Sequence, residues 1–175
     1  MTTTAHPPLP WGAGPFEAAP LPDDLRAWFE PAQLVRLTLD AVADLAGPQR
    51  WPAGPADGPT FTRATYLTLL TYSYATGRFG SETIEAACHE DAQLRYLAGA
   101  CPPAALVRRF RRHHRAVIGV ALSRLIETCA ILQRASHSPA WPIPAAPGAP
   151  AEWFADQAAQ RIQRAVLEDS VAADL

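Results

Sequence analysis

The chain has 175 residues, of which 49% are hydrophobic and 18% charged, so it can form one domain with a sizeable core but not a second, enzymatic domain. No run approaches the roughly 18 apolar residues of a membrane-spanning helix, and no apolar segment follows a charged start, so we expect a cytoplasmic protein without membrane contact. The net charge of −2 gives no sign of a nucleic-acid partner until the charges are located along the sequence.

Proline accounts for 18 residues, about twice the usual share, and divides the chain into segments. Residues 1–22 form a Pro-rich leader, and two further clusters form a loop at 47–59 and a linker at 135–150. We therefore expect a helical domain at 23–134 and a separate C-terminal helix at 151–175.

Hydrophobic residues at helical spacing, with Gly or Pro at segment ends, predict helices between the proline clusters. Ser81 is expected to cap one short helix and Asp91 the next, which ends at Gly99. No segment alternates as β-strands do, so the predicted fold class is all-α, a compact multi-helix domain. The expected helices cover residues 31–46, 62–76, a short segment after Ser81, 91–98, 104–114, 115–134 and 151–172.

One apolar stripe runs along the 115–134 helix at spacings of four and three residues, which is typical of a core or a partner-facing seam. Its members are Ile118, Leu122, Leu125, Cys129 and Leu132.

Arginine is concentrated in one part of the chain, because residues 92–126 contain seven arginines and no acidic residue. That stretch carries a charge of +7, whereas the remainder carries −9. Within it, the segment 104–115 projects onto a helix with an apolar side and a basic side. The apolar side holds Leu106, Val107 and Phe110, and the opposite side holds Arg108, Arg111, Arg112 and Arg115.

Guanidinium groups donate paired hydrogen bonds to phosphate and to the edge of guanine. We therefore predict that the 104–115 helix binds duplex DNA as a recognition helix, preceded by the 91–98 helix in a helix-turn-helix-like unit. The hypothesis requires side chains that reach a polyanion and are not held in carboxylate pairs; a solvated charged face is the alternative. The predicted DNA-binding residues are Arg108, Arg109, Arg111, Arg112, Arg115 and His113.

The cysteines and histidines lack the spacing of a paired-cysteine zinc site, so we expect no metal and no other cofactor. The cysteines are odd in number and widely spaced, which favours free thiols over a disulfide framework. No nucleophile has an identifiable base, and no carboxylates are paired, so we expect no catalytic residue. The residues weighed as metal ligands are Cys88, His89, Cys101, His113, His114 and Cys129.

Two blocks of sequence resemble a known family. The first, LPDDLRAWFEPAQLVRLTLDAVADL at 21–45, leads from a polar start into an amphipathic helix. The second, at 62–114, contains a Leu- and Tyr-rich helix, Gly, a Ser-capped helix, an acid-capped helix ending in Leu-Ala-Gly, and a helix ending in RFRRHH. From about Leu21 to Ala130 the chain resembles the N-terminal domain of InsH-type insertion-sequence transposases.

The resemblance implies a helical domain that binds the terminal inverted repeats of a mobile element. In the family a ribonuclease-H-like catalytic domain follows, which begins with an Asp-Gly-Thr strand. Residues 131–150 read ILQRASHSPAWPIPAAPGAP and contain no such strand. The family's charged turn before the Arg-rich helix is also replaced, by Cys101-Pro102-Pro103-Ala104. We therefore expect a non-catalytic DNA-binding protein that resembles a truncated transposase.

Two other hypotheses compete with DNA binding. In the first, the chain is a protein-interaction module. The seam helix at 115–134 and the last helix pair either with a second copy of the chain, as a homodimer, or with a full-length transposase. In the other it is the product of a gene remnant, which folds but binds little.

Overall fold

A computed structural model of the chain describes residues 21–45, 61–136 and 151–173. The predicted leader, loop and linker lie outside these ranges, apart from residues 21, 22, 135 and 136. Within them the structure is helical and has no strand, which confirms the predicted all-α class. The elements are η1 (Leu25–Ala27), α1 (Pro31–Ala43), α2 (Arg63–Ala75), α3 (Ser81–Glu90), α4 (Ala92–Ala98), α5 (Ala104–Ser136) and α6 (Ala151–Ala173).

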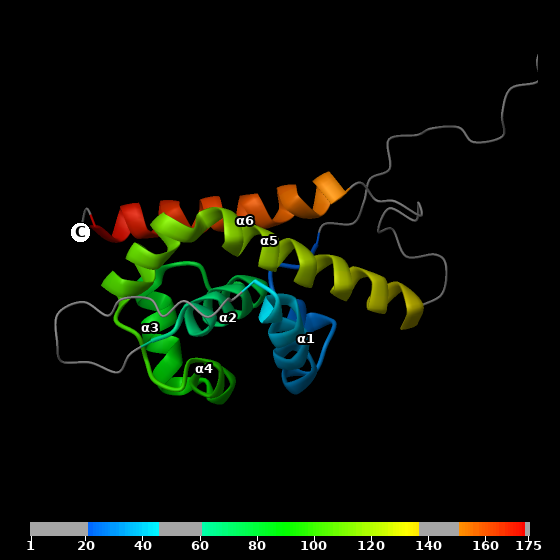
Figure 1. The fold of residues 1–175 in the computed structure, drawn as a ribbon, viewed down its shortest axis with the longest axis horizontal. Helices are drawn as coiled ribbons and strands as arrows, with labels where there is room; N and C mark the ends of the chain where they lie inside the picture. Colours follow the sequence, from blue (N-terminus) through cyan, green and yellow to red (C-terminus); the bar gives the residue numbers. More distant parts are fainter. Residues whose placement is uncertain (1–20, 46–60, 137–150, 174–175) are drawn as a thin grey trace, which may run out of the picture.

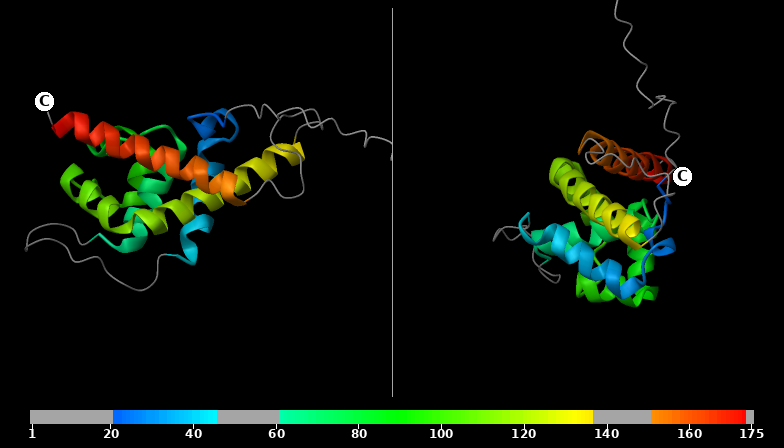
Figure 2. Two further views of the ribbon diagram at one scale, coloured as in Figure 1. Left: turned by 90° about the horizontal axis from the view of Figure 1, so that it is seen from above. Right: turned by 90° about the vertical axis from the view of Figure 1, so that its right-hand side faces the viewer.

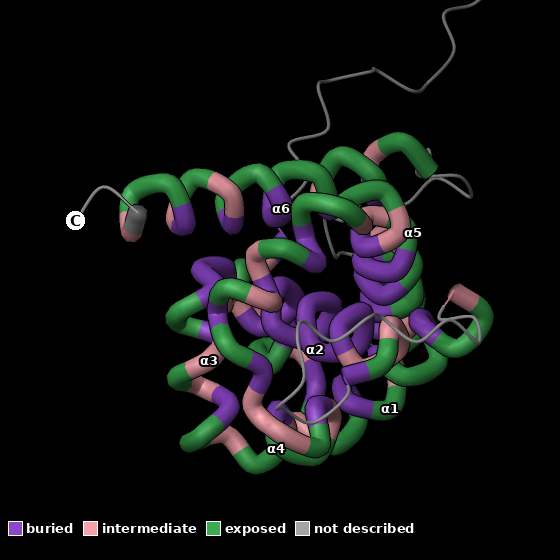
Figure 3. The backbone as a smooth tube through the Cα atoms, turned by 60° about the vertical axis from the view of Figure 1, so that its left-hand side comes forward, coloured by how far each residue is buried: buried purple, intermediate pink, exposed green. Residues whose placement is uncertain are grey.

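Helix α2 is the centre of the fold (Figures 1 and 3). Its sequence is apolar or hydroxylic on every side, and all residues from Tyr66 to Thr76 are buried. A helix without a polar face must be covered all round. Helices α1, α4 and α5 pack against it, and the α5 side chain Phe110 stacks on Tyr66 with ring centroids 4.7 Å apart.

Helix α5 joins the two helices that were expected at 104–114 and 115–134. It is continuous, but His114 departs from helical geometry with φ −121° and ψ 22°. The predicted division thus coincides with a bend. Beyond it, the predicted apolar seam belongs to the core of the chain's own fold, because Ile118, Leu122, Leu125 and Cys129 are completely buried.

Helix α6 lies along α5 and crosses it obliquely (Figures 1 and 2). Its buried face repeats at intervals of three and four residues through Phe154, Ala158, Ile162 and Ala165, as expected for an amphipathic helix. On the same face Arg161 donates hydrogen bonds to the backbone carbonyls of residues 22, 23 and 74. Helix α6 therefore shares the core of the helices that precede it.

Most helix ends agree with the predicted signals. Asp91 caps α4 through bonds from the amides of Gln93 and Leu94, and Gly99 ends it in the left-handed region with φ 67°. Helix α1 ends at Ala43, three residues before the predicted end. The prediction for Ser81 is wrong, because Gly80 is the N-cap of α3 and Ser81 is its first helical residue.

The helix-turn-helix-like unit remains a sequence-based expectation. Helix α4 packs mainly against α2 and α3, and a turn at Gly99 then leads the chain to α5. The amide of Ala104, at the start of α5, donates to the Glu85 carboxylate of α3 over 2.8 Å. Glu85 thus supplies the cap that the Pro102-Pro103 turn lacks.

The stretch Ala104–Gln133 of α5 is long and apolar enough to cross a membrane, by length and composition alone. The core helix of a water-soluble protein passes the same test.

Candidate nucleic-acid interface

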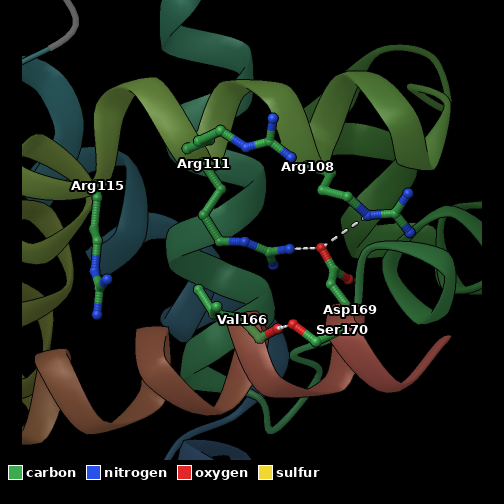
Figure 4. Close-up of a pocket in the computed structure, with 7 residues that line it drawn as sticks. Arg108, Arg111, Arg115, Val166, Asp169 and Ser170 are labelled. Carbon is green, nitrogen blue, oxygen red and sulfur yellow. Dashed lines mark hydrogen bonds and ion pairs between the residues drawn. The ribbon is translucent and has the colours of Figure 1, made fainter. Parts of the chain in front are cut away.

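Four of the predicted DNA-binding arginines line one cleft between α5 and α6, which we call the arginine cleft (Figure 4). The cleft has a volume of about 340 Å³. The four arginines that the sequence placed on one side of the helix thus border the same cleft. The lining residues are Arg108, Arg111, Arg112 and Arg115 of α5 and Val166, Asp169 and Ser170 of α6.

The expectation that all four guanidinium groups point outward is wrong for Arg111. This side chain is only 3% exposed, because α6 covers the side of α5 that was expected to be open. Arg111 donates hydrogen bonds to the Tyr74 hydroxyl over 2.9 Å and to the Phe79 carbonyl over 3.2 Å. It also forms an ion pair with Asp169. A group so enclosed stabilises the fold and cannot reach a polyanion while α6 covers it.

The surroundings of Arg111 are dry enough to affect neighbouring groups. Burial raises the pKa of the Tyr74 hydroxyl to about 12, and the adjacent Arg111 charge opposes that rise. Tyr74 therefore stays protonated at neutral pH. Its oxygen accepts from Arg111, as a buried guanidinium requires.

Arg108 is also paired, although its side chain is 30% exposed. Its Nε donates to Asp169 over 3.1 Å, and one terminal nitrogen lies 3.4 Å from an oxygen of Glu82. The DNA-binding hypothesis requires guanidinium groups that are not paired with carboxylates, and Arg108 and Arg111 do not meet this requirement.

Arg112 and Arg115 keep the exposure that the hypothesis requires. Arg115 donates to the Gln163 side chain, a neutral acceptor, over 2.9 Å. For Arg112, no hydrogen bond or ion pair of the side chain occurs within residues 21–45, 61–136 and 151–173. Arg109 and His113 are exposed beside the cleft, and the Nδ1 atom of His113 lies 2.8 Å from the Arg109 carbonyl oxygen.

Asp169 is the residue that sequence reasoning missed. Its side chain is 7% exposed, and its Oδ1 accepts from the Ser81 amide over 2.7 Å while Oδ2 accepts from the Ser81 hydroxyl over 2.8 Å. The next acid, Glu168, accepts from the Gly80 amide over 2.9 Å. The acids of α6 therefore satisfy the start of α3, where we had expected Ser81 to act as the cap.

A sequence signal for Asp169 exists. It follows Ala165 by four residues on the apolar stripe of α6, so its carboxylate is placed toward the core. A buried carboxylate needs a cationic or hydrogen-bonding partner. The arginines of α5 are the obvious candidates.

The cleft carries excess positive charge, because four guanidinium groups line it with one carboxylate, Asp169, and one more, Glu82, lies 3.4 Å from Arg108. The excess resides on Arg112 and Arg115, which are exposed, so salt screens its attraction for anions.

Other candidate sites are not assembled in the described parts of the chain. No group of three or more His, Cys, Asp or Glu side chains there is placed to hold a metal ion. All three cysteines are free thiols, as their number and spacing predicted; Cys88 and Cys129 are buried, and Cys101 is half-buried.

The seam that we considered for partner binding is filled within the chain. Leu122 and Leu125 have no exposed surface, and α6 packs on α5. These side chains are thus not available to a second copy unless the domain opens.

The chain matches no protein-family model, and no curated protein or solved structure matches it either.

Proposed function

We propose that this protein is a non-catalytic DNA-binding protein that uses the arginine cleft to bind backbone phosphates of duplex DNA. The observation that carries the proposal is the pair of exposed guanidinium groups, Arg112 and Arg115, in an arginine-lined cleft that is open to solvent. Arginine pairs with phosphate through two parallel charge-assisted hydrogen bonds, and phosphate contacts dominate the affinity of proteins for DNA.

Arg112 and Arg115 are the direct contacts in this proposal, since both line the cleft and both are exposed. Arg109 and His113 lie beside them and contact the adjacent phosphate. Arg111 has a structural role instead, because it is buried behind the cleft. The contacting set is therefore smaller than the sequence predicted.

The mode of binding also differs from that of a recognition helix. A recognition helix places one free face in the major groove, whereas α6 lies along α5 (Figure 2) and its residues line the cleft together with the α5 arginines. The cleft is better suited to contacts with the sugar–phosphate backbone, which position a protein but carry little sequence information. Inverted repeats of a mobile element, as implied by the transposase resemblance, stay a sequence-based expectation, since backbone contacts alone would not select them over other duplexes.

The test is the affinity of the protein for a labelled duplex of mixed sequence, measured by fluorescence anisotropy across a salt series. Log affinity falls with log salt by about 0.9 for each phosphate contacted. We expect Arg112→Ala and Arg115→Ala each to weaken binding and to reduce this slope by about one.

Arg95→Ala is the matched control. Arg95 belongs to the same acid-free stretch of sequence and is exposed, but it lies on α4, away from the cleft. It should have a much smaller effect than either cleft variant. Equal effects of all three variants, or no measurable affinity of the parent at low salt, would contradict the proposal.

A further inference from the structure

The last two turns of α6 are held to the rest of the molecule by polar contacts. As far as Ala165 the helix is fixed by buried apolar side chains. Beyond that residue, Asp169 is the only buried side chain up to residue 172, and Leu167 and Val171 are 56% and 64% exposed. This end of α6 can separate from α3 and α5 without opening the apolar core.

The contacts that hold this end form a site for an oxyanion. The carboxylate of Asp169 accepts from the amide and hydroxyl of Ser81 and from Arg108, and it pairs with the buried Arg111. Two guanidinium groups, a hydroxyl and the first amides of a ten-residue helix are the donors that proteins use to bind phosphate. Asp169 binds both guanidinium groups, the Ser81 hydroxyl and the Ser81 amide at once, whereas the Gly80 amide is bound by Glu168.

The same carboxylate controls the charge of the cleft. With Asp169 in place, Arg108 and Arg111 are both held in ion pairs with it (Figure 4), and Arg112 and Arg115 are the cleft arginines that remain for an external anion. With the end of α6 released, Arg108 and the Ser81 donors would also become available to the anion, on the same side of α5 as Arg112 and Arg115.

We infer that Asp169 is an internal competitor for phosphate groups, and that the end of α6 is an autoinhibitory segment of the arginine cleft. Its DNA-dependent consequence rests on the proposed function. A phosphate that displaces the carboxylate gains the donors of Ser81, Arg108 and Arg111, and the last two turns of α6 move away from α3.

Asp169→Asn tests the inference, because it removes the charge and leaves the size of the side chain unchanged. Asp156→Asn is the control, since Asp156 is an exposed acid of the same helix and gives the same change in net charge. Two probes are used: inorganic phosphate, by the shift in thermal midpoint, and the labelled duplex, by anisotropy. Circular dichroism verifies that both variants are helical.

We expect phosphate to raise the thermal midpoint of Asp169→Asn clearly more than that of Asp156→Asn. The affinity of Asp169→Asn for the duplex should rise about tenfold, the equivalent of one charge-assisted hydrogen bond, against less than about twofold for the control. In the parent protein, hydrogen exchange at residues 166–172 should become faster when the duplex is bound. If Asp169→Asn does not fold, this hydrogen-exchange measurement on the parent protein tests the competitor role of Asp169.

The two proposals fail in different ways. Equal responses of Asp169→Asn and Asp156→Asn to phosphate and to the duplex, or unchanged exchange in the DNA-bound parent, overturn the competitor role while leaving cleft binding intact. Absence of duplex binding in every variant, together with a selective phosphate effect on Asp169→Asn, overturns DNA binding and supports competition by Asp169.

Discussion

Replacing Arg111 with alanine distinguishes the structural role of this buried side chain from the DNA contact that the sequence predicted. If Arg111 were an exposed DNA contact, Arg111→Ala would lower DNA affinity and leave stability unchanged. The structure predicts a large loss of stability, because Arg111 has 3% exposure and bonds to Tyr74, Phe79, Ser81 and Asp169. Its removal leaves a buried carboxylate and a buried hydroxyl short of a donor.

The magnitude follows from the environment of the ion pair. Removing one partner of a buried pair costs about 3–5 kcal/mol. Asp169 keeps Arg108 and the two Ser81 donors, so we expect a value near the lower limit, about 3 kcal/mol. In a chain of this size such a loss lowers the thermal midpoint by about 10 °C.

The assay is urea denaturation followed by far-ultraviolet circular dichroism, with Arg112→Ala as the matched variant. Arg112 is the next residue along the helix, has the same charge and is exposed, so its loss should change the free energy of unfolding by less than about 0.5 kcal/mol. If both variants unfold at the same urea concentration, the burial and pairing of Arg111 are refuted.

Two other predictions concern thiols and glycines. Burial raises the pKa of the Cys88 and Cys129 thiols to about 12. At neutral pH iodoacetamide should therefore alkylate the half-buried Cys101 first and the other two thiols only on unfolding. Mass spectrometry of samples taken over time measures this order. Equal rates in the native protein would contradict this. Gly99→Ala should lower the free energy of unfolding by about 1 kcal/mol, because φ is 67° there. Gly119 lies in the interior of α5 with ordinary contact to Ile162, so Gly119→Ala should raise the free energy of unfolding by about 0.5 kcal/mol or more. Urea titrations in which both glycine variants change the free energy of unfolding in the same direction would refute the backbone argument.

Sequence reasoning was most successful where the signals are local. Asp91 caps α4 through its own side chain, and Gly99 ends α4 as the left-handed residue, both as predicted. The apolar period of the 115–134 segment identified a buried seam, since burial on one side of a helix leaves a regular spacing. It did not distinguish a core from a partner interface, because both bury the same side chains.

The position of Arg111 could have been inferred from the sequence. At about 100° per residue it lies only about 40° from Val107 on the helical projection, next to the apolar side. Arg112 and Arg115 lie farther from Val107 and are exposed. Treating the four arginines as one group concealed this difference.

The packing of α6 on the arginine face was not predictable from such patterns. The amphipathic period of 151–172 shows that the helix covers something apolar, but not which helix it covers. The contacts that fix its position join residues about 88 apart in the chain. No local rule relates such distant residues.

That separation along the chain has a consequence for protein synthesis. Ribosomes add about 5–20 residues per second, so the 88 positions between Ser81 and Asp169 correspond to a delay of about 4 to 18 s. During this interval the first amides of α3, and later the guanidinium group of Arg111 once it has been synthesised, have no carboxylate from α6 to bind. A nascent chain at that stage offers them to any polyanion nearby, ribosomal RNA included, until the final helix emerges and takes its place.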